Sequence, residues 1–529
     1  MLELREIKLP IDKLTDEKTE LKKLAAKRLG IAVSEIREFS IRRKALDARK
    51  KNEICYVYTL HIGVSGKEAR FTHKKGVAEA EIFTYEIKKA ENTGERPVVV
   101  GFGPAGMFAA LLLAKAGFKP IVLERGEKAE DRAKKVEQFF REGKLDPESN
   151  VQFGEGGAGT FSDGKLNTGT HNKRIGWVLE QFAAFGAPEN ICYDAKPHIG
   201  TDILIKVVGN LRREIEKLGG EVRFGAKFTG YEAKDGKLVG VTYEKDGKTE
   251  HLSCSELVLA IGHSARDTFS MLYESGLKME PKAFSMGVRI EHKQEKIGFA
   301  QYGEAYRKLP AADYKLSCRT EKGTSAYTFC MCPGGAVVAA ASEEGGVVTN
   351  GMSYSGRDLE NANSALLVTL MPEDFPYPGV MGGVLWQREI ERKAYQLSNG
   401  YFAPAQLLGD FLEKKPSSGY RSVCPSYRPG VYFTELEKVL PEKITETLRE
   451  AIPLFARKLK GFDDPDAVLT APETRSSSPV RILRGETRET EISGIYPAGE
   501  GAGYAGGIVS AAVDGLLTAE AIIDKSLSF

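Results

Sequence analysis

Three glycines in the first quarter of the chain have the spacing of a nucleotide-binding turn. Gly101, Gly103 and Gly106 form a G-x-G-x-x-G pattern between a short apolar run and an Ala- and Leu-rich segment, with Pro104 and Ala105 inside the motif. Glycines at these positions permit a tight turn and let backbone N–H groups approach a pyrophosphate, which the positive end of the following helix attracts. The pattern therefore predicts a dinucleotide-binding turn.

An acidic residue at the end of the next apolar run narrows the choice of dinucleotide. Glu124 follows the motif by about 20 residues, the separation at which a carboxylate accepts hydrogen bonds from ribose hydroxyls. A carboxylate repels a 2′-phosphate, so this position favours FAD or NAD over NADP. We include the neighbouring Arg125 among the expected cofactor-binding residues.

A second Gly-rich element lies about 400 residues further on. It contains Gly499-Glu500 and Gly506-Gly507-Ile508, between a strand pattern and a helix of small residues. A nicotinamide dehydrogenase usually completes its dinucleotide site within one contiguous domain, so two such distant elements favour FAD over NAD. No second G-x-G-x-x-G follows a strand pattern. We therefore expect NADH or NADPH to bind only transiently, if one of them supplies the electrons.

The elements that must position these motifs alternate between strand and helix patterns. Residues 98–100 and 121–123 read as apolar strands around a helix over 107–116, which is a βαβ unit. Strands over 221–232, 238–244 and 250–254 are separated by Asp-Gly pairs and predict an antiparallel meander. A strand over 257–261 follows, and 494–523 returns to strand, Gly-rich turn and helix.

The first 90 residues differ in charge from the rest of the chain. They carry 21 Lys and Arg residues against 14 Asp and Glu, whereas the whole chain has a net charge of +2. A helix over 15–30 and strands over 39–41 and 54–62 predict a small α+β module, and the polar stretch 91–97 predicts a linker. The basic runs 42–44 and 49–51 fit a solvated hairpin face or a surface for nucleic acid.

Composition excludes several classes of protein. A chain of 529 residues with 42% hydrophobic and 28% charged residues is typical of a globular protein of about three domains. The start of the chain lacks a secretory signal pattern, and we expect no transmembrane helix. Seven scattered cysteines do not resemble a disulfide framework, so we expect a cytoplasmic protein.

The two distant Gly-rich elements resemble the glutathione-reductase-like FAD superfamily, in which the first holds the ADP half of FAD and the second holds the flavin half. The resemblance implies that Glu500 holds ribityl hydroxyls, although the family usually has Gly-Asp at this place. It also implies that a helix starting at Gly506, Gly507 and Ile508 points at the flavin ring. Matching segments at Ala260-Ile261-Gly262 and 153–166 add further expected cofactor contacts: Ala260, Gly262, Gly157, Gly159, Thr160, Ser162 and Lys165. A flexible surface loop is the alternative for 153–166.

At a finer level the chain is similar to a family of uncharacterised FAD-dependent dehydrogenases. The segments that carry this resemblance are 284–292, 327–335, 350–353, 361–366 and 473–481, and with the N-terminal module they cover nearly the whole chain. The resemblance implies FAD as the cofactor, but it identifies no substrate.

Charged side chains in two of these segments are candidates for chemistry. His292, beside Glu291 and Arg289, can supply an acid, a base or an anion clamp, and a surface ion pair is the alternative. Arg475 and Arg481 flank three serines and can bind a carboxylate or a phosphate. A surface ion pair or a helix cap is the alternative for this pair.

Cys330-x-Cys332 is a further candidate. The pair fits redox-active cysteines beside a flavin, but the close spacing would give a strained disulfide. We therefore favour buried small residues near the substrate cleft. No second cysteine pair accompanies it, so we expect no metal site.

Together these patterns predict an α/β fold with a three-layer Rossmann-like FAD-binding domain built from two chain segments, an inserted α+β substrate domain and the small N-terminal module. The expected boundaries are 1–94 for the module, 95–275 and 466–529 for the FAD-binding domain, and 276–465 for the substrate domain. The favoured function is a FAD-dependent oxidoreductase with non-covalent FAD, which exchanges a hydride between flavin N5 and a small organic molecule. An RNA-linked flavoprotein, either tRNA-modifying or RNA-binding, is the main alternative; an electron-transfer flavoprotein and a monooxygenase stay open.

Overall fold

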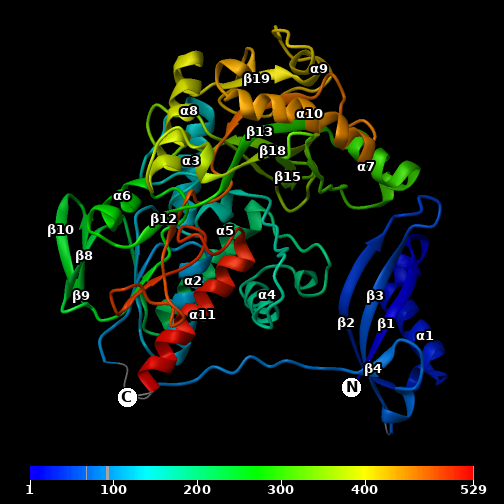
Figure 1. Ribbon diagram of the computed structural model, residues 1–529. Helices are drawn as coiled ribbons and strands as arrows, with labels where there is room; N and C mark the ends of the chain where they lie inside the picture. The colour runs from blue at the N-terminus through cyan, green and yellow to red at the C-terminus, as the bar shows by residue number, and fades with distance from the viewer. Residues whose placement is uncertain (67, 91–93, 528–529) are drawn as a thin grey trace.

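A computed structural model describes residues 1–66, 68–90 and 94–527 (Figure 1). The α/β fold class is confirmed. The central element is a five-stranded parallel sheet in the order β23-β11-β5-β6-β7. Its strands are β5 (Val98–Val100), β6 (Ile121–Glu124), β7 (Glu221–Phe224), β11 (Leu257–Leu259) and β23 (Ile495–Pro497). Because β23 comes from the end of the chain, two distant segments build one sheet.

The two faces of this sheet have different covers because successive strand residues point in opposite directions. Val99 and Val122 pack into a helical layer, whereas Val100 and Leu123 pack against a second sheet. The helical layer contains α2 (Pro104–Ala116), α4 (Arg174–Ala184), α5 (Thr201–Lys217) and α11 (Ile508–Leu527). The other layer contains β8 (Lys227–Lys234), β9 (Lys237–Lys245), β10 (Lys248–Ser253) and α6 (Arg266–Glu274).

A seven-stranded sheet forms the second large unit, with the order β14-β15-β18-β13-β21-β19-β20. Its strands are β13 (Phe284–Lys293), β14 (Ser317–Arg319), β15 (Ser325–Cys332), β18 (Asn361–Leu370), β19 (Ala403–Leu407), β20 (Val431–Phe433) and β21 (Val468–Glu473). Around it lie α3 (Ala129–Glu142), α7 (Gln294–Tyr302), α8 (Gly382–Ser398), α9 (Leu408–Leu412) and α10 (Glu442–Lys458) (Figure 1). Two short strand pairs form separate two-stranded sheets: β12 (Met279–Pro281) with β22 (Val480–Ile482), and β16 (Ala336–Ala339) with β17 (Thr349–Met352).

The N-terminal module has its own core and sits at the side of the molecule (Figure 1). A four-stranded sheet in the order β2-β3-β1-β4 packs against one helix. The elements are β1 (Leu2–Pro10), α1 (Glu17–Leu29), β2 (Ile36–Asp47), β3 (Cys55–Val64) and β4 (Val77–Glu79). Backbone hydrogen bonds of Lys44 with Tyr193 and Ala195, each 2.8 Å long, join the module to the body.

The structure corrects three expectations about elements. The single strand expected over 221–232 is two strands, because Gly225, with φ of 62°, ends β7 before β8 begins. The predicted boundary at 465 also fails, since β21 pairs with β13 and β19 in the seven-stranded sheet rather than with the parallel sheet. β1 was not anticipated. Of the expected linker 91–97, residues 91–93 lie outside the described residues.

Among the described residues, no helix combines the length and the apolar character that crossing a membrane requires.

Candidate functional site

The G-x-G-x-x-G turn joins β5 to α2 and is held by close backbone contacts. Gly101 has φ of 92°, and a Cβ atom placed on it would lie 2.3 Å from the carbonyl oxygen of Ala260. A Cβ atom on Gly106 would lie 1.9 Å from the carbonyl oxygen of Gly101. On Gly103, the nearest atom would be Gly157 Cα at an ordinary 3.7 Å. The fold itself therefore requires Gly101 and Gly106, whereas Gly103 leaves free space at the N-terminus of α2.

Two further residues of the motif shape this helix terminus. Pro104 occupies the first turn of α2, where its missing N–H costs no intrahelical hydrogen bond. Gly103 at the N-cap offers no side chain to cap the free N–H groups, so they are open to an anion. Ala105 is buried and lies so close to α11 that a Cβ atom on Gly515 would come within 2.0 Å of the Ala105 carbonyl oxygen.

Glu124 joins two loops of the site at the end of β6. Its carboxylate accepts hydrogen bonds from the N–H groups of Phe102 (2.8 Å), Gly126 (2.9 Å) and Gly154 (3.0 Å). The side chain is buried, at 4% exposure. A carboxylate has about four acceptor positions, so three backbone donors leave little capacity for the predicted contact with ribose. In this structure Glu124 mainly fixes the turn against the Gly-rich loop.

A buried arginine, which the sequence analysis missed, organises that Gly-rich loop. Arg132 of α3 donates hydrogen bonds to the carbonyl oxygens of Asn150 (2.7 Å), Val151 (2.9 Å), Glu155 (2.7 Å) and Gly157 (2.9 Å). Its guanidinium is inaccessible to solvent. The loop is therefore built around a fixed cation and is not the flexible surface loop considered as an alternative.

The Gly-rich loop meets both Gly-rich elements of the cofactor prediction. A Cβ atom on Gly157 would lie 3.0 Å from Gly103 Cα, and one on Gly159 would lie 3.1 Å from Ile508 Cγ1 at the start of α11. Lys165, further along the loop, donates a hydrogen bond to the carbonyl oxygen of Met331 in the seven-stranded sheet. The structure thus brings three distant segments to one place.

Two other predicted residues of the loop turn inward and stabilise it. The Thr160 hydroxyl donates to the Glu155 carbonyl oxygen at 3.3 Å, and the Ser162 hydroxyl donates to the Gly159 carbonyl oxygen at 2.7 Å. Their side-chain donors are therefore used within the loop.

The C-terminal Gly-rich element leads into the start of α11, which contacts the Gly-rich loop. Gly499 donates its N–H to Asp514 Oδ2 at 2.7 Å, and Arg484 holds Asp514 through an ion pair of 2.8 Å. Glu500 is half-buried, and its carboxylate has no hydrogen-bond partner among the described residues. Burial raises the pKa of Glu500 to about 7. A Cβ atom on Gly506 would meet nothing within 4 Å, so the start of α11 is open.

The segment after β11, with Ala260 and Gly262, is the last predicted part of the cofactor site. Gly262 has φ of 71° and is solvent-exposed, and a Cβ atom on it would meet no atom within 4 Å. Arg125, in contrast, is already paired with Glu148 (2.7 Å) and Asp267 (2.9 Å). Its predicted contact with the cofactor would have to come from the face of the guanidinium or the backbone.

The donor set fits FAD. An uncapped helix N-terminus beside Gly103 suits the pyrophosphate, and the open surface at Gly506 and Gly262 leaves room for a ligand at the far end. The Glu500 carboxylate, with no partner of its own among the described residues, suits hydroxyl donors such as those of the ribityl chain. Ile508 places the positive end of α11 against Gly159 of the Gly-rich loop.

The candidate acid–base residues do not form one cluster. Arg289 is fully buried and pairs with Glu473 at 3.0 Å, while Glu291 accepts hydrogen bonds from Asn361 and Ser426. His292 points to the other face of β13, where its Nε2 lies 2.8 Å from the carbonyl oxygen of Phe462. Burial lowers the pKa of His292. His292 and Arg289 therefore contact different parts of the protein, and their catalytic roles stay predictions.

Cys330 and Cys332 lie near the flavin end of the expected cofactor site. Arg289 Nη2 donates to the Cys330 carbonyl oxygen and contacts Cys332 Sγ at 3.4 Å. Arg289 also pairs with Glu473 at 3.0 Å, so one guanidinium connects this carboxyl with both cysteines. Burial raises the pKa of Glu473 to about 7.

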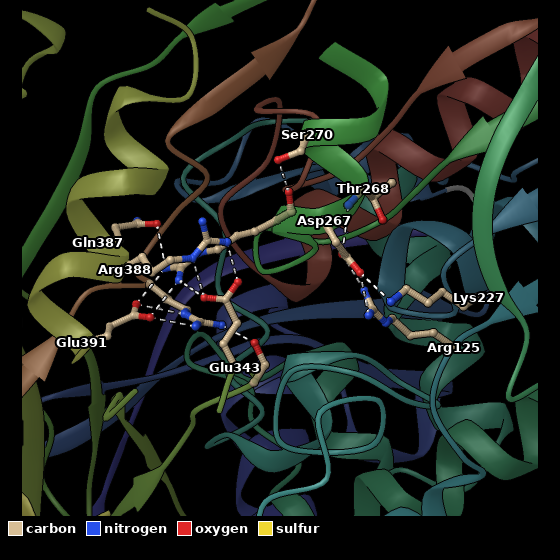
Figure 2. Close-up of polar contacts among 12 residues, drawn as sticks. Arg125, Lys227, Asp267, Thr268, Ser270, Glu343, Gln387, Arg388 and Glu391 are labelled. Atoms are coloured by element: carbon tan, nitrogen blue, oxygen red, sulfur yellow. Dashed lines mark hydrogen bonds and ion pairs between the residues drawn. The ribbon is translucent and has the colours of Figure 1, made fainter. Parts of the chain in front are cut away.

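Arg475 is part of a buried ion cluster between α6 and α8 (Figure 2). Glu391 pairs with Arg475 at 2.9 Å and with Arg266 at 2.7 Å, and Glu343 pairs with Arg266 and Arg388. Arg475 is 6% exposed. Its guanidinium is already occupied by Glu391 inside the protein, and its binding of a carboxylate or phosphate stays a prediction. Figure 2 also shows Arg125 and Lys227 pointing at Asp267 on the other side of α6.

The second arginine of that pair and the N-terminal basic runs are engaged in contacts within the protein. Arg481 pairs with Glu280 at 3.3 Å on the β12–β22 pair. Lys44 pairs with Glu17 at 2.7 Å, Arg49 pairs with Asp47, and Lys51 donates to the Ala300 carbonyl oxygen at 2.8 Å. These contacts use part of the basic surface that the RNA-linked alternative requires.

Family models match two parts of the chain. Residues 283–476 match a family described as "FAD-dependent protein, C-terminal domain-like", and residues 1–63 match a "Domain of unknown function (DUF8436)". The first description agrees with FAD as the cofactor.

Solved structures resemble the chain more remotely. The flavin-dependent brominase Bmp2, as a triple mutant, is 13% identical with a TM-score of 0.36, over 82% of this chain and 81% of that one. A 3-ketosteroid-delta4-(5alpha)-dehydrogenase from Rhodococcus jostii RHA1 is 13% identical with a TM-score of 0.34, over 83% of this chain and 99% of that one. Similarities of this size do not establish a shared activity.

A curated relative covers almost the entire sequence. An "Uncharacterized protein" of Clostridium beijerinckii is 49% identical over 521 residues, which are 97% of each chain. Since this identity extends through the N-terminal module, the Gly-rich elements and the seven-stranded sheet, the chain belongs to the same protein family as the Clostridium beijerinckii protein.

Proposed function

We propose that the chain is a FAD-dependent oxidoreductase of the glutathione-reductase-like type, with an organic substrate bound between the Gly-rich elements and the seven-stranded sheet. The observation that carries the proposal is the meeting of the β5–α2 turn, the Gly-rich loop and the start of α11 at one place, beside the uncapped N-terminus of α2. FAD, when bound, supplies hydride chemistry that side chains lack.

The residues of the chain have separate roles in this proposal. The free N–H groups at the start of α2 bind the pyrophosphate, and Glu124 and Arg132 hold the two loops in place for it. The start of α11 supplies a positive helix end, which favours the negative charge that a flavin acquires on reduction.

Two carboxyls can handle the protons that accompany hydride transfer. Burial raises the pKa of both Glu473 and Glu500 to about 7, so each exists in both protonation states near neutral pH. A group with a pKa near the working pH is the most effective general acid or base. Arg289 pairs with Glu473 and holds that carboxyl in a fixed position.

Anaerobic titration with NADH and then NADPH tests the reaction class. We expect the oxidised-flavin absorbance of the purified protein to disappear on addition of one of the two nucleotides. Reoxidation by added organic acceptors would then identify the substrate class. If neither nucleotide nor any reduced organic compound bleached the flavin, while FAD remained bound, the oxidoreductase proposal would be wrong.

A further inference from the structure

The N-terminal module is held against the body by few polar contacts (Figure 1). The Lys44 N–H donates to the carbonyl oxygen of Tyr193, and the Ala195 N–H donates to the carbonyl oxygen of Lys44, both at 2.8 Å. Lys51 Nζ donates to the carbonyl oxygen of Ala300, also at 2.8 Å. Among the described residues, no other hydrogen bond and no ion pair joins the part of the module before the linker to the body. Because water can replace each of these bonds, the docked position is weakly held.

The start of the linker has the properties of a hinge. Residues 81–84 lie in neither a helix nor a strand, and they form no hydrogen bond among the described residues. The linker is then fixed to the body, because the Tyr85 hydroxyl donates to Glu520 at 2.5 Å and the Ala90 N–H donates to the Ala116 carbonyl oxygen at 3.1 Å. A module that leaves its docked position therefore turns about 81–84 and stays beside the body.

The body segment on which the module docks, residues 193–199, also contacts the Gly-rich loop. Asp194 pairs with Lys44 of β2 in an isolated parallel bridge. Four residues later, His198 pairs with Lys165 of the Gly-rich loop in an isolated antiparallel bridge. One short segment is therefore bonded to the module near one end and to the Gly-rich loop near the other.

Backbone hydrogen bonds on both sides of Lys165 hold the Gly-rich loop to this segment. The Leu166 N–H donates to the carbonyl oxygen of Pro197 at 2.9 Å, and the Ile199 N–H donates to the carbonyl oxygen of Gly164 at 3.1 Å. Lys165, one of the expected cofactor contacts, lies between these two bonds. The position of its backbone therefore depends on the segment that the module docks on.

We propose that docking of the N-terminal module regulates the cofactor site, because it fixes the Gly-rich loop through residues 193–199. In the docked state this segment is bonded at both ends, and the loop keeps the form that binds FAD. In the undocked state the backbone groups of Tyr193 and Ala195 face water, and the loop loses part of its support. The ion pair of Lys196 with Asp313 at 2.6 Å keeps the segment on the body, so undocking loosens the loop without unfolding it.

Coupling between two binding events acts in both directions. If docking strengthens FAD binding, bound FAD must strengthen docking by the same factor. Such couplings usually change an affinity about 5- to 150-fold. We therefore expect undocking to weaken FAD binding at least about fivefold, and we expect FAD to slow hydrogen exchange of the Ala195 N–H. The part of this inference that concerns FAD rests on the proposed function.

Lys44→Pro in the full-length protein opens the dock without removing a bond of the module's own sheet. Proline has no N–H, so the hydrogen bond to Tyr193 is lost. Both backbone groups of Lys44 bond to the body and therefore point away from β3, so the pairing of β2 with β3 loses no hydrogen bond. Lys44→Met is the matched control, because it loses the same side chain, with its ion pair to Glu17, but keeps the backbone N–H.

Hydrogen exchange followed by mass spectrometry reads the dock and the loop separately, with and without FAD. We expect Lys44→Pro to exchange faster than the parent and Lys44→Met in peptides that cover 193–195 and in peptides that cover 162–166. Faster exchange at 193–195 with unchanged exchange at 162–166 would overturn the proposal. Unchanged exchange at 193–195 would also overturn it, because the dock would then not depend on Lys44.

A locked variant tests the opposite change and covers the case in which Lys44→Pro unfolds the module. Lys44→Cys with Asp194→Cys puts two cysteines at a bridge pair, where the separation of neighbouring strands suits a disulfide. We expect the oxidised protein to exchange more slowly at 162–166 than the same protein after reduction. Equal exchange before and after reduction of a disulfide that mass spectrometry has verified would contradict the coupling.

FAD titration of the same proteins separates this proposal from the proposed function. If Lys44→Pro speeds exchange of the loop but the parent binds no FAD, the coupling stands and the proposed function is wrong. If the parent binds FAD and Lys44→Pro binds it equally tightly, with unchanged exchange of the loop, the oxidoreductase stands and the regulatory role of the module is wrong.

Discussion

Replacing Glu391 by Gln should severely destabilise the junction between α6 and α8. Glu391 accepts hydrogen bonds from Arg266 at 2.8 and 2.7 Å and from Arg475 at 3.1 and 2.9 Å, and the Thr474 hydroxyl donates to it at 2.6 Å. Both guanidinium groups are buried. Without the Glu391 charge, Glu343 is the nearest carboxylate left to balance them.

The magnitude follows from the burial of these charges. Removal of one partner from a buried ion pair costs about 3–5 kcal/mol because an uncompensated charge stays inside the protein. The introduced amide could keep one hydrogen bond through its carbonyl oxygen, so the lower half of this range is expected. We therefore predict that Glu391→Gln lowers the free energy of unfolding by about 3–4 kcal/mol at pH 7.

The effect should depend on pH. Burial alone would raise the pKa of Glu391, but Arg266 and Arg475 hold it well below the ordinary value of 4.5. The unfolded chain therefore binds a proton in a pH range where the folded protein does not. The stabilisation is complete above about pH 5 and is lost as the pH falls below 4.5. The difference between the two proteins should shrink at pH 4.

Urea unfolding followed by circular dichroism measures this difference, with Glu389→Gln as the matched control. Glu389 lies on the same helix, is exposed, and accepts a hydrogen bond from the Tyr377 hydroxyl at 3.0 Å. Its substitution should cost less than about 0.5 kcal/mol. Equal costs for the two variants at pH 7 would refute the assignment of Glu391 as the anion that balances the cluster.

Three further predictions concern the candidate cofactor site. Gly103→Ala should leave the unfolding midpoint unchanged yet weaken FAD binding at least tenfold. Gly106→Ala should prevent stable folding, because its Cβ would lie 1.9 Å from a carbonyl oxygen. Flavin fluorescence measures FAD binding, and circular dichroism measures folding. Glu124→Gln should cost about 1–3 kcal/mol of stability, measured by urea unfolding, since an amide cannot accept all three backbone hydrogen bonds; an unchanged midpoint would contradict its role. Glu500 has a raised pKa, so its ionisation reduces stability as the pH rises from 4.5 through about 7. Glu500→Gln should therefore match the parent at pH 4.5 and exceed it by about 1–2 kcal/mol at pH 8, and a difference independent of pH would contradict this.

The elements around the cofactor were predictable because local spacing determines them. The glycines of the β5–α2 turn, the carboxylate at the end of β6 and the glycines before α11 stand next to the strands and helices they serve. A periodic apolar pattern bounded by glycines is a local signal. The joining of two distant segments in one sheet was expected from the resemblance to two-segment flavin domains, and β23 pairs with β11 accordingly.

The residues that were missed act through contacts distant in sequence. Arg132 holds the Gly-rich loop from α3, and Asp514 holds Gly499 from within α11, yet neither belongs to a motif. Arg289 and His292 are close in sequence, but they lie on opposite faces of β13 and contact different partners. The hydrogen bond from Cys332 and the charges of Arg289 and Lys165 lower the pKa of Cys330, and no spacing rule predicts the contributions of Arg289 and Lys165.

The flavin content of the purified protein tests the assignment of the cofactor site most directly. Heat-released chromophore is identified by chromatography and quantified against protein, for the parent and for Gly103→Ala. One FAD per chain in the parent, with a clearly lower content in Gly103→Ala despite an unchanged fold, is the predicted result. A colourless parent protein that takes up no added FAD would contradict the assignment of the β5–α2 turn, the Gly-rich loop and the start of α11 as the FAD site.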